Sequence, residues 1–219
     1  MDLAFLLDGS GTMKHVYPYA KAFIMMLAEE FHLSPNHTHI GIIVFSETAI
    51  LEVEFDKHQD IKEFQKDVDK LDFVGHRTHL DIAFDEANTH LFNETMGARP
   101  DARKVMIVLS DGHHNKGPGG KDDDEVTKAQ KASKPLLDKN VTIVVIGLYG
   151  TVKAHPETLA HIAGNRKENV LMIAHAPDLL SPTFLSGLVY QYCGQAGIRA
   201  RGVNDEEVKD VKSTPDTPT

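Results

Sequence analysis

Asp8-Gly9-Ser10-Gly11-Thr12 follows the first apolar run of the chain, Leu3 to Leu7. An almost uninterrupted apolar run of this length is typical of a strand buried in a parallel sheet. The carboxylate and two hydroxyls that follow, at alternating positions, are hard oxygen ligands, which suit Mg²⁺, Ca²⁺ or Mn²⁺ better than zinc or copper. Taken alone, the stretch predicts either a turn rich in small polar residues or the first loop of a metal site.

Two later residues, Thr78 and Asp111, also have side-chain oxygen atoms and also lie where one predicted element ends or the next begins. Thr78 precedes an apolar pattern with helical spacing, Leu80 to Leu91, and Asp111 ends a second buried run, Lys104 to Ser110. Because ligands of parallel sheets bind at the carboxyl ends of the strands, we expect these two positions to meet the Asp8 loop at one edge of the sheet. By itself, Thr78 is better interpreted as a cap for the helix that follows it.

Strands and helices are predicted to alternate along nearly the whole chain. Strand-length apolar runs occupy Leu3–Leu7, Ile40–Phe45, Ala49–Phe55, Lys104–Ser110, Val141–Gly147 and Asn169–Ala174. Helical patterns occupy Lys14–Phe31, Asp60–Leu71, Leu80–Leu91, Asp122–Leu137, Pro156–Ala163 and Thr183–Tyr192. This order predicts an α/β fold with a doubly wound, mostly parallel central sheet and helices on both faces. Ala49 to Phe55 alternates apolar and acidic residues, which favours one antiparallel edge strand.

The Asp8–Thr12 loop, Thr78 and Asp111-Gly112 together resemble the motif of the von Willebrand factor type A domain family. The metal-ion-dependent adhesion site of that family combines an Asp-x-Ser-x-Ser loop, a later Thr and a later Asp-Gly. The resemblance covers Asp2 to about Cys193. It implies a Rossmann-like fold and a divalent metal held by Asp8, Ser10, Thr12, Thr78 and Asp111. The hydroxyls would ligate the metal, and the two carboxylates would balance its charge directly or through water. Thr12 stands where the family has its second serine, which affects geometry and affinity more than metal binding itself.

What the resemblance implies is a binding module and not an enzyme. An acidic side chain of a protein ligand would complete the coordination of a bound Mg²⁺, Mn²⁺ or Ca²⁺. Collagen or another matrix protein is the implied partner. The implied location is secreted, in the extracellular matrix. The alternative is an intracellular domain of the same family that scaffolds a larger complex. We expect the domain to occupy residues 1–193, and the polar residues 194–219 to form a linker or disordered tail.

Charge and composition bear on whether the chain binds nucleic acid or membranes. The formal net charge is -9, from 23 basic and 32 acidic residues, and no basic cluster is present, which argues against binding to nucleic acid or an anionic membrane surface. No apolar run approaches the ~20 residues that a membrane span requires. Three glycosylation sequons, at Asn36, Asn93 and Asn140, are compatible with secretion. No signal peptide is recognisable.

Cys193 is the only cysteine, so the sequence provides no partner for a disulfide within this chain. Extracellular members of the resembled family often pair a cysteine at this position with one just before the first strand. The expected partner would therefore lie upstream of Asp2.

Three enzyme signatures are incomplete. An aspartyl-nucleophile phosphatase needs a second acid two residues after the nucleophile, where this chain has Ser10. A dinucleotide fingerprint needs a third glycine where Lys14 stands. The glycine-rich residues 117–122 lack the spacing and the Ser/Thr of a phosphate-binding Walker loop.

Two further metal hypotheses come from histidines and from an acidic run. His76, His79, His113 and His114 are expected on loops around the metal position, and His37-x-His39 is a second possible zinc or nickel pair. None has the helical spacing of a catalytic zinc site. The acidic run 122–125 is consistent with a second calcium site, but carboxylates are also ordinary in a first helical turn.

Overall fold

A six-stranded sheet with the order β3-β2-β1-β4-β5-β6 forms the centre of the computed structural model, which describes residues 1–112, 122–151 and 156–194. Its strands are β1 (Asp2–Asp8), β2 (His39–Phe45), β3 (Ala49–Val53), β4 (Lys104–Ser110), β5 (Val141–Leu148) and β6 (Val170–Ile173). All neighbouring strands are parallel except β2 and β3, which are antiparallel. The predicted mostly parallel sheet with one antiparallel edge strand is confirmed.

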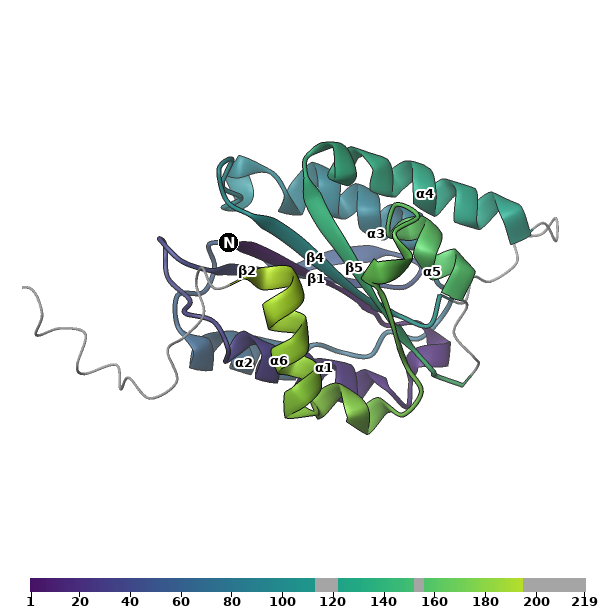
Figure 1. Ribbon diagram of the computed structural model, residues 1–219, viewed down its shortest axis with the longest axis horizontal. Coiled ribbons are helices and arrows are strands. Elements are labelled where there is room, and N and C mark those ends of the chain that lie inside the picture. Colours follow the sequence, from purple (N-terminus) through teal and green to yellow (C-terminus); the bar gives the residue numbers. More distant parts are fainter. Residues whose placement is uncertain (113–121, 152–155, 195–219) are drawn as a thin grey trace, which may run out of the picture.

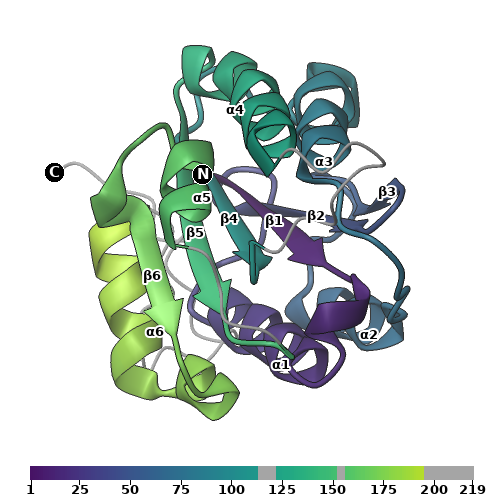
Figure 2. The ribbon, with the colours of Figure 1, turned by 90° about the vertical axis from the view of Figure 1, so that its right-hand side faces the viewer.

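Helices cover both faces of this sheet (Figures 1 and 2). One face carries α1 (Tyr17–Ala28), α2 (Ile61–Lys70) and α6 (Pro182–Leu188), and the other carries α3 (Leu80–Glu86), α4 (Asp122–Asp138) and α5 (Pro156–Ile162). Short 3-10 segments lie at Gly11–Met13 (η1), Glu94–Met96, Lys167–Asn169 and Ala176–Leu180. Wider π-helical turns at Ala87–Leu91 and Val189–Cys193 continue α3 and α6.

The central strand β1 shows why the sheet needs two helical layers. Its seven residues are all buried, with successive side chains on opposite faces. Phe5 and its neighbours Leu3 and Leu7 belong to the apolar cluster under α1, whereas Ala4 and Leu6 belong to the cluster under α3 and α4. A strand that is apolar on both faces is stable only when each face is covered.

The first helix begins later than its apolar periodicity predicts. We expected a helix over 14–31, but the chain forms η1 and then an α-helix from Tyr17 to Ala28. Pro18 explains the difference, because proline has no N–H to donate and its ring clashes with the preceding turn unless it lies in the first turn. A helix that began at Lys14 would place Pro18 in its interior.

The predicted loop after β4 and the predicted end of the domain fall partly outside the described residues. The loop 113–121 and the segment 195–219 are not described, so the boundary at 193 stays a prediction. Within the described parts of the chain, no helix is both long enough and apolar enough to cross a membrane.

Candidate metal centre

The first loop of the site is held between two other loops by backbone hydrogen bonds. Gly9 N donates to Phe45 O at 2.8 Å, and Gly75 N donates to Gly9 O at 2.8 Å. Gly11 N then donates to His76 O at 3.0 Å. The segment before Thr78 therefore runs alongside the segment after Asp8, as the convergence of the loops predicts.

Asp8 is fully buried at the end of β1, and two neighbours hold its carboxylate. Ser10 N donates to Oδ1 at 2.9 Å, and the hydroxyl of Ser110 donates to Oδ2 at 2.6 Å. From the sequence, Ser110 was predicted only as the last residue of a strand, without a role in the site. The parallel register offered a signal, because Leu7 pairs with Leu109 and the next residues of the two strands are therefore neighbours.

The surroundings of Asp8 disfavour its charged form when no metal is present. Burial raises the pKa of the Asp8 carboxyl from its usual 3.8 to about 7, with a second contribution from the negative charge of Asp111. Hydrogen bonds from Ser110 and Ser10 act in the opposite direction. Two fully buried carboxyl groups close enough to interact are expensive unless a cation compensates them.

The two hydroxyls of the first loop lie close together. Ser10 Oγ is 3.3 Å from Thr12 Oγ1, and Ser10 is buried whereas Thr12 is partly exposed. This part of the site is therefore open to solvent on the Thr12 side.

Thr78 does not cap a helix. The N-cap of α3 is His79, which makes no side-chain capping bond, and Thr78 is only 2% exposed. The Thr78 Oγ1 atom is buried with no hydrogen-bond partner among the described residues. Because a buried hydroxyl without a partner is costly, this atom suits a ligand that the protein itself does not supply.

The donor set fits a hard divalent cation. It consists of two carboxylates and three hydroxyls, all oxygen, from the loops of Asp8, Thr78 and Asp111. In the described part of the chain, no three His, Cys, Asp or Glu side chains are grouped to hold a metal, so a histidine-based zinc site is not found there. His113 and His114 lie outside the described residues, as do the side chains of the acidic run 122–125.

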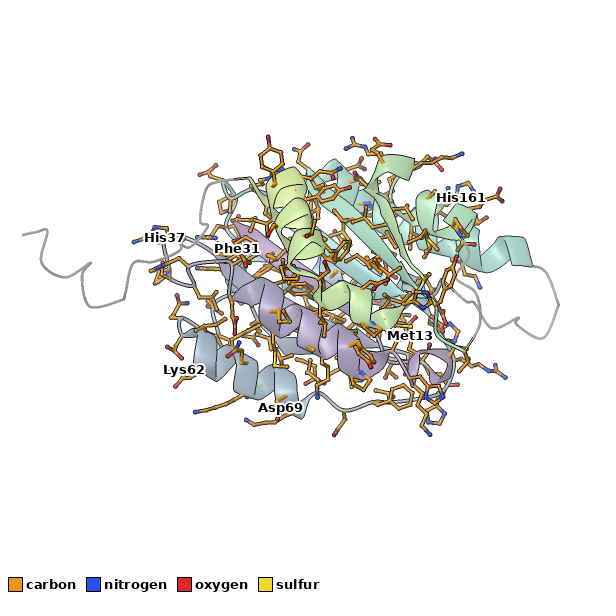
Figure 3. All side chains as sticks on the ribbon, turned by 60° about the horizontal axis from the view of Figure 1, so that its bottom comes forward. Met13, Phe31, His37, Lys62, Asp69 and His161 are labelled. Carbon is orange, nitrogen blue, oxygen red and sulfur yellow. The ribbon has the colours of Figure 1, made fainter. Side chains whose placement is uncertain are left out.

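The site occupies one end of the molecule. Met13, which ends η1, lies at the end of the molecule opposite to Phe31 and His37 in Figure 3. His76 is exposed, and its backbone lies in the left-handed region with a φ of 68°. His79 is partly buried with Nδ1 4.0 Å from Asp81 Oδ1.

Comparison with known proteins relates nearly the whole described chain to one family. The sequence profile of the von Willebrand factor type A domain matches residues 2–182. Similar curated proteins include integrin alpha-11 of Mus musculus, 26% identical over 81% of this chain and 14% of that protein. Matrilin-4 of Mus musculus is 26% identical over 91% of this chain and 30% of that protein. The collagen alpha-5(VI) chain of Mus musculus is 28% identical over 73% of this chain and 6% of that protein.

Solved structures share the fold. Proximal thread matrix protein 1 from the mussel byssus superposes with a TM-score of 0.74 at 23% identity, covering 88% of this chain and 47% of that one. A second structure of that protein, with a TM-score of 0.73 at 22% identity over 88% of this chain and 48% of that one, is described as having a zinc-occupied MIDAS motif. The chain thus spans less than half the length of the relatives it matches.

Proposed function

Because the chain belongs to the von Willebrand factor type A domain family, we propose that it is a protein-binding domain whose binding depends on a divalent metal ion. The proposed metal ligands are Asp8, Ser10, Thr12, Thr78 and Asp111. The proposed ion is Mg²⁺, which Mn²⁺ or Ca²⁺ can replace, and no chemical reaction is part of the proposal.

The buried hydroxyl of Thr78, which has no hydrogen-bond partner among the described residues, is the observation that carries this proposal. Leaving such a group without a hydrogen bond costs about 1 to 3 kcal/mol. A cation placed between Thr78 and the Asp8 loop would give the hydroxyl oxygen a partner. The same ion would compensate the buried carboxylate of Asp8 next to that of Asp111.

The composition of the site also favours recognition of an acidic ligand. Three of the five proposed ligands are neutral hydroxyls, so the two carboxylates do not overcompensate a charge of +2. The bound ion supplies a positive centre that attracts a further carboxylate, which a protein partner would provide. The partial exposure of Thr12 leaves this side of the site accessible.

The relatives support a matrix or adhesion role. They include integrin, matrilin and collagen chains, which are adhesion and extracellular-matrix proteins, so a matrix protein such as collagen is the partner we propose. An extracellular location is part of the proposal, and the same comparison supports it.

A binding assay on immobilised collagens and other purified matrix proteins tests this function. We expect binding in Mg²⁺ that disappears in EDTA and in Asp8→Ala. Asp69→Ala, which removes an exposed carboxylate on α2, is the matched control and should bind as the parent does. Binding that is indifferent to EDTA, or equal in Asp8→Ala, would contradict metal dependence. A folded domain that binds no member of the panel would exclude these proteins as ligands.

A further inference from the structure

The described residues that follow β5, 149–151 (the β5 loop), lie directly against the first loop of the candidate metal centre. Thr151 N donates to Thr12 O at 2.9 Å. Next to it, a Cβ atom added to Gly150 would overlap the carbonyl oxygen of Thr12 and would lie 3.0 Å from its carbonyl carbon. The same Cβ would be 3.3 Å from Asp111 Oδ2. A side chain at position 150 would thus contact two of the five proposed metal ligands.

We propose that Gly150 is a positioning residue for the metal centre: the absence of a side chain allows the β5 loop to hold Thr12 and Asp111 in their places. This inference rests on the proposed metal site. Gly150 itself would not touch the metal.

A clash between a new Cβ at position 150 and Thr12 would be hard to relieve, because the atoms it meets first belong to the Thr12 backbone. Thr12 cannot simply retreat, since Gly11 is bonded to His76 O on one side and Met13 is fully buried on the other. Gly150 does not adopt a left-handed backbone conformation, so an alanine there adds a steric contact without adding backbone strain. An added methyl group is therefore expected to displace η1 or the β5 loop.

The β5 loop is also constrained on its far side. Tyr149 N donates to Ile173 O at 3.3 Å, and the partly buried Tyr149 packs against the apolar cluster under α3 and α4. If the β5 loop yields little, the displacement falls on Thr12, whose side chain and backbone move together. Small displacements of metal ligands are costly, because residues that orient such ligands typically contribute about 10- to 100-fold in metal affinity.

Other glycines of the chain provide matched controls. A Cβ on Gly147 would lie 2.6 Å from Leu159 Cδ1 and 2.7 Å from Met172 Sδ, which are core side chains and not metal ligands. A Cβ on Gly187, in α6, would meet no atom within 4 Å. The three glycine-to-alanine variants therefore differ in what the new methyl group meets. At Gly150 it meets the metal loops, at Gly147 it meets the core, and at Gly187 it meets no atom.

Calorimetric titration with MnCl₂, combined with urea unfolding of the metal-free proteins, tests the inference. Gly150→Ala should weaken Mn²⁺ binding by about tenfold or more. Gly147→Ala should lower stability and keep the parental Mn²⁺ affinity, and Gly187→Ala should leave both properties unchanged or raise stability slightly because alanine favours helix. A purely structural role of Gly150 would lower stability without changing metal affinity.

A folded Gly150→Ala variant with parental Mn²⁺ affinity would overturn the inference. If that variant does not fold, Thr151→Pro replaces it, because proline removes the N–H that bonds Thr12 O at an exposed position. It should weaken Mn²⁺ binding severalfold, and unchanged affinity would again reject the inference. A parent domain that binds no Mn²⁺ would instead refute the proposed function, so the two failures are distinguishable.

Discussion

The hydroxyl of Ser110 donates a 2.6 Å hydrogen bond to Asp8 Oδ2, joining the carboxyl ends of β1 and β4 across 102 residues of sequence. Both side chains are fully buried. The bond fixes the orientation of the Asp8 carboxylate and lowers its pKa, against burial and the negative charge of Asp111, which raise it. Ser110 also accepts a 3.0 Å hydrogen bond from Gly112 N, which fixes the backbone beside Asp111.

Ser110→Ala should therefore weaken both metal binding and the metal-free fold. Loss of the hydroxyl leaves Asp8 Oδ2 without this donor and raises the pKa of the Asp8 carboxyl further, so protons compete better with the metal at neutral pH. We expect Mn²⁺ affinity to fall about 10-fold or more and stability in EDTA to fall by about 1 to 3 kcal/mol. Calorimetry and urea unfolding measure the two effects.

Ser133→Ala is the control for Ser110→Ala, because Ser133 is also buried but, within the described part of the chain, donates to the carbonyl of Gln130 in α4 and to no metal ligand. Its Mn²⁺ affinity should equal that of the parent. Equal affinities in all three proteins would mean that Ser110 does not orient the metal ligand.

Thr78→Val should change stability and metal binding in opposite directions. Valine keeps the shape of threonine but removes a buried hydroxyl that has no partner among the described residues. The metal-free domain should gain about 1 kcal/mol of stability, whereas Mn²⁺ affinity should be largely lost. Thr78→Ser keeps the hydroxyl and should keep most of the affinity. A Thr78→Val variant that is less stable in EDTA would show that the hydroxyl has a favourable structural contact.

The thiol of Cys193 should be unreactive in the folded domain. Cys193 is 1% exposed, and burial raises the pKa of its thiol from 9.0 to about 12. The folded state therefore keeps the thiol proton between pH 9 and 12 whereas the unfolded state releases it, so this group's contribution to stability is full below pH 9 and is lost as the pH rises towards 12.

At pH 10 the loss at Cys193 amounts to about 1 kcal/mol. Urea unfolding under reducing conditions at pH 8 and pH 10 should show a decline in the parent that is larger by this amount than in Cys193→Ala. Alkylation of the native protein at pH 8 should be far slower than in denaturant. Equal rates in the two states would contradict the buried position.

Arg99→Met should destabilise the fold without affecting the metal centre. Arg99 Nε and Nη2 donate to Oδ1 of the fully buried Asp2 at 2.9 and 2.6 Å, and Arg99 N donates to Oδ2 at 2.7 Å. Breaking such a pair leaves a buried carboxylate uncompensated, which costs about 3 to 5 kcal/mol. Asp2 and Asp8 are at opposite ends of β1, about 20 Å apart. Parental Mn²⁺ affinity in a destabilised variant is the expected result, and weakened affinity would show coupling along the strand.

Sequence patterns predicted the sheet well because buried parallel strands are continuous apolar runs. β4 occupies the predicted residues Lys104–Ser110, and Ala49–Val53 forms the expected antiparallel edge. The start of α1 was predicted three residues too early, because periodicity alone ignores the constraint that Pro18 imposes on the preceding turn.

The site was predictable only in part. Side-chain chemistry and the convergence of strand ends indicate which loops meet, and the structure brings the Asp8 and Thr78 loops together. The roles of Ser110 and Gly150 were not predicted, since they depend on tertiary contacts over 102 and 138 residues and neither has a local sequence signature.

Calorimetric titration of MnCl₂ into the metal-free parent and into Asp8→Asn tests the metal centre most directly. Asparagine keeps the size of the side chain and removes the charge that a cation needs. We predict one saturable Mn²⁺ site in the parent and an affinity at least about tenfold lower in the folded Asp8→Asn protein. A parent that binds no Mn²⁺, or equal affinity in the two proteins, would contradict a metal site built around Asp8.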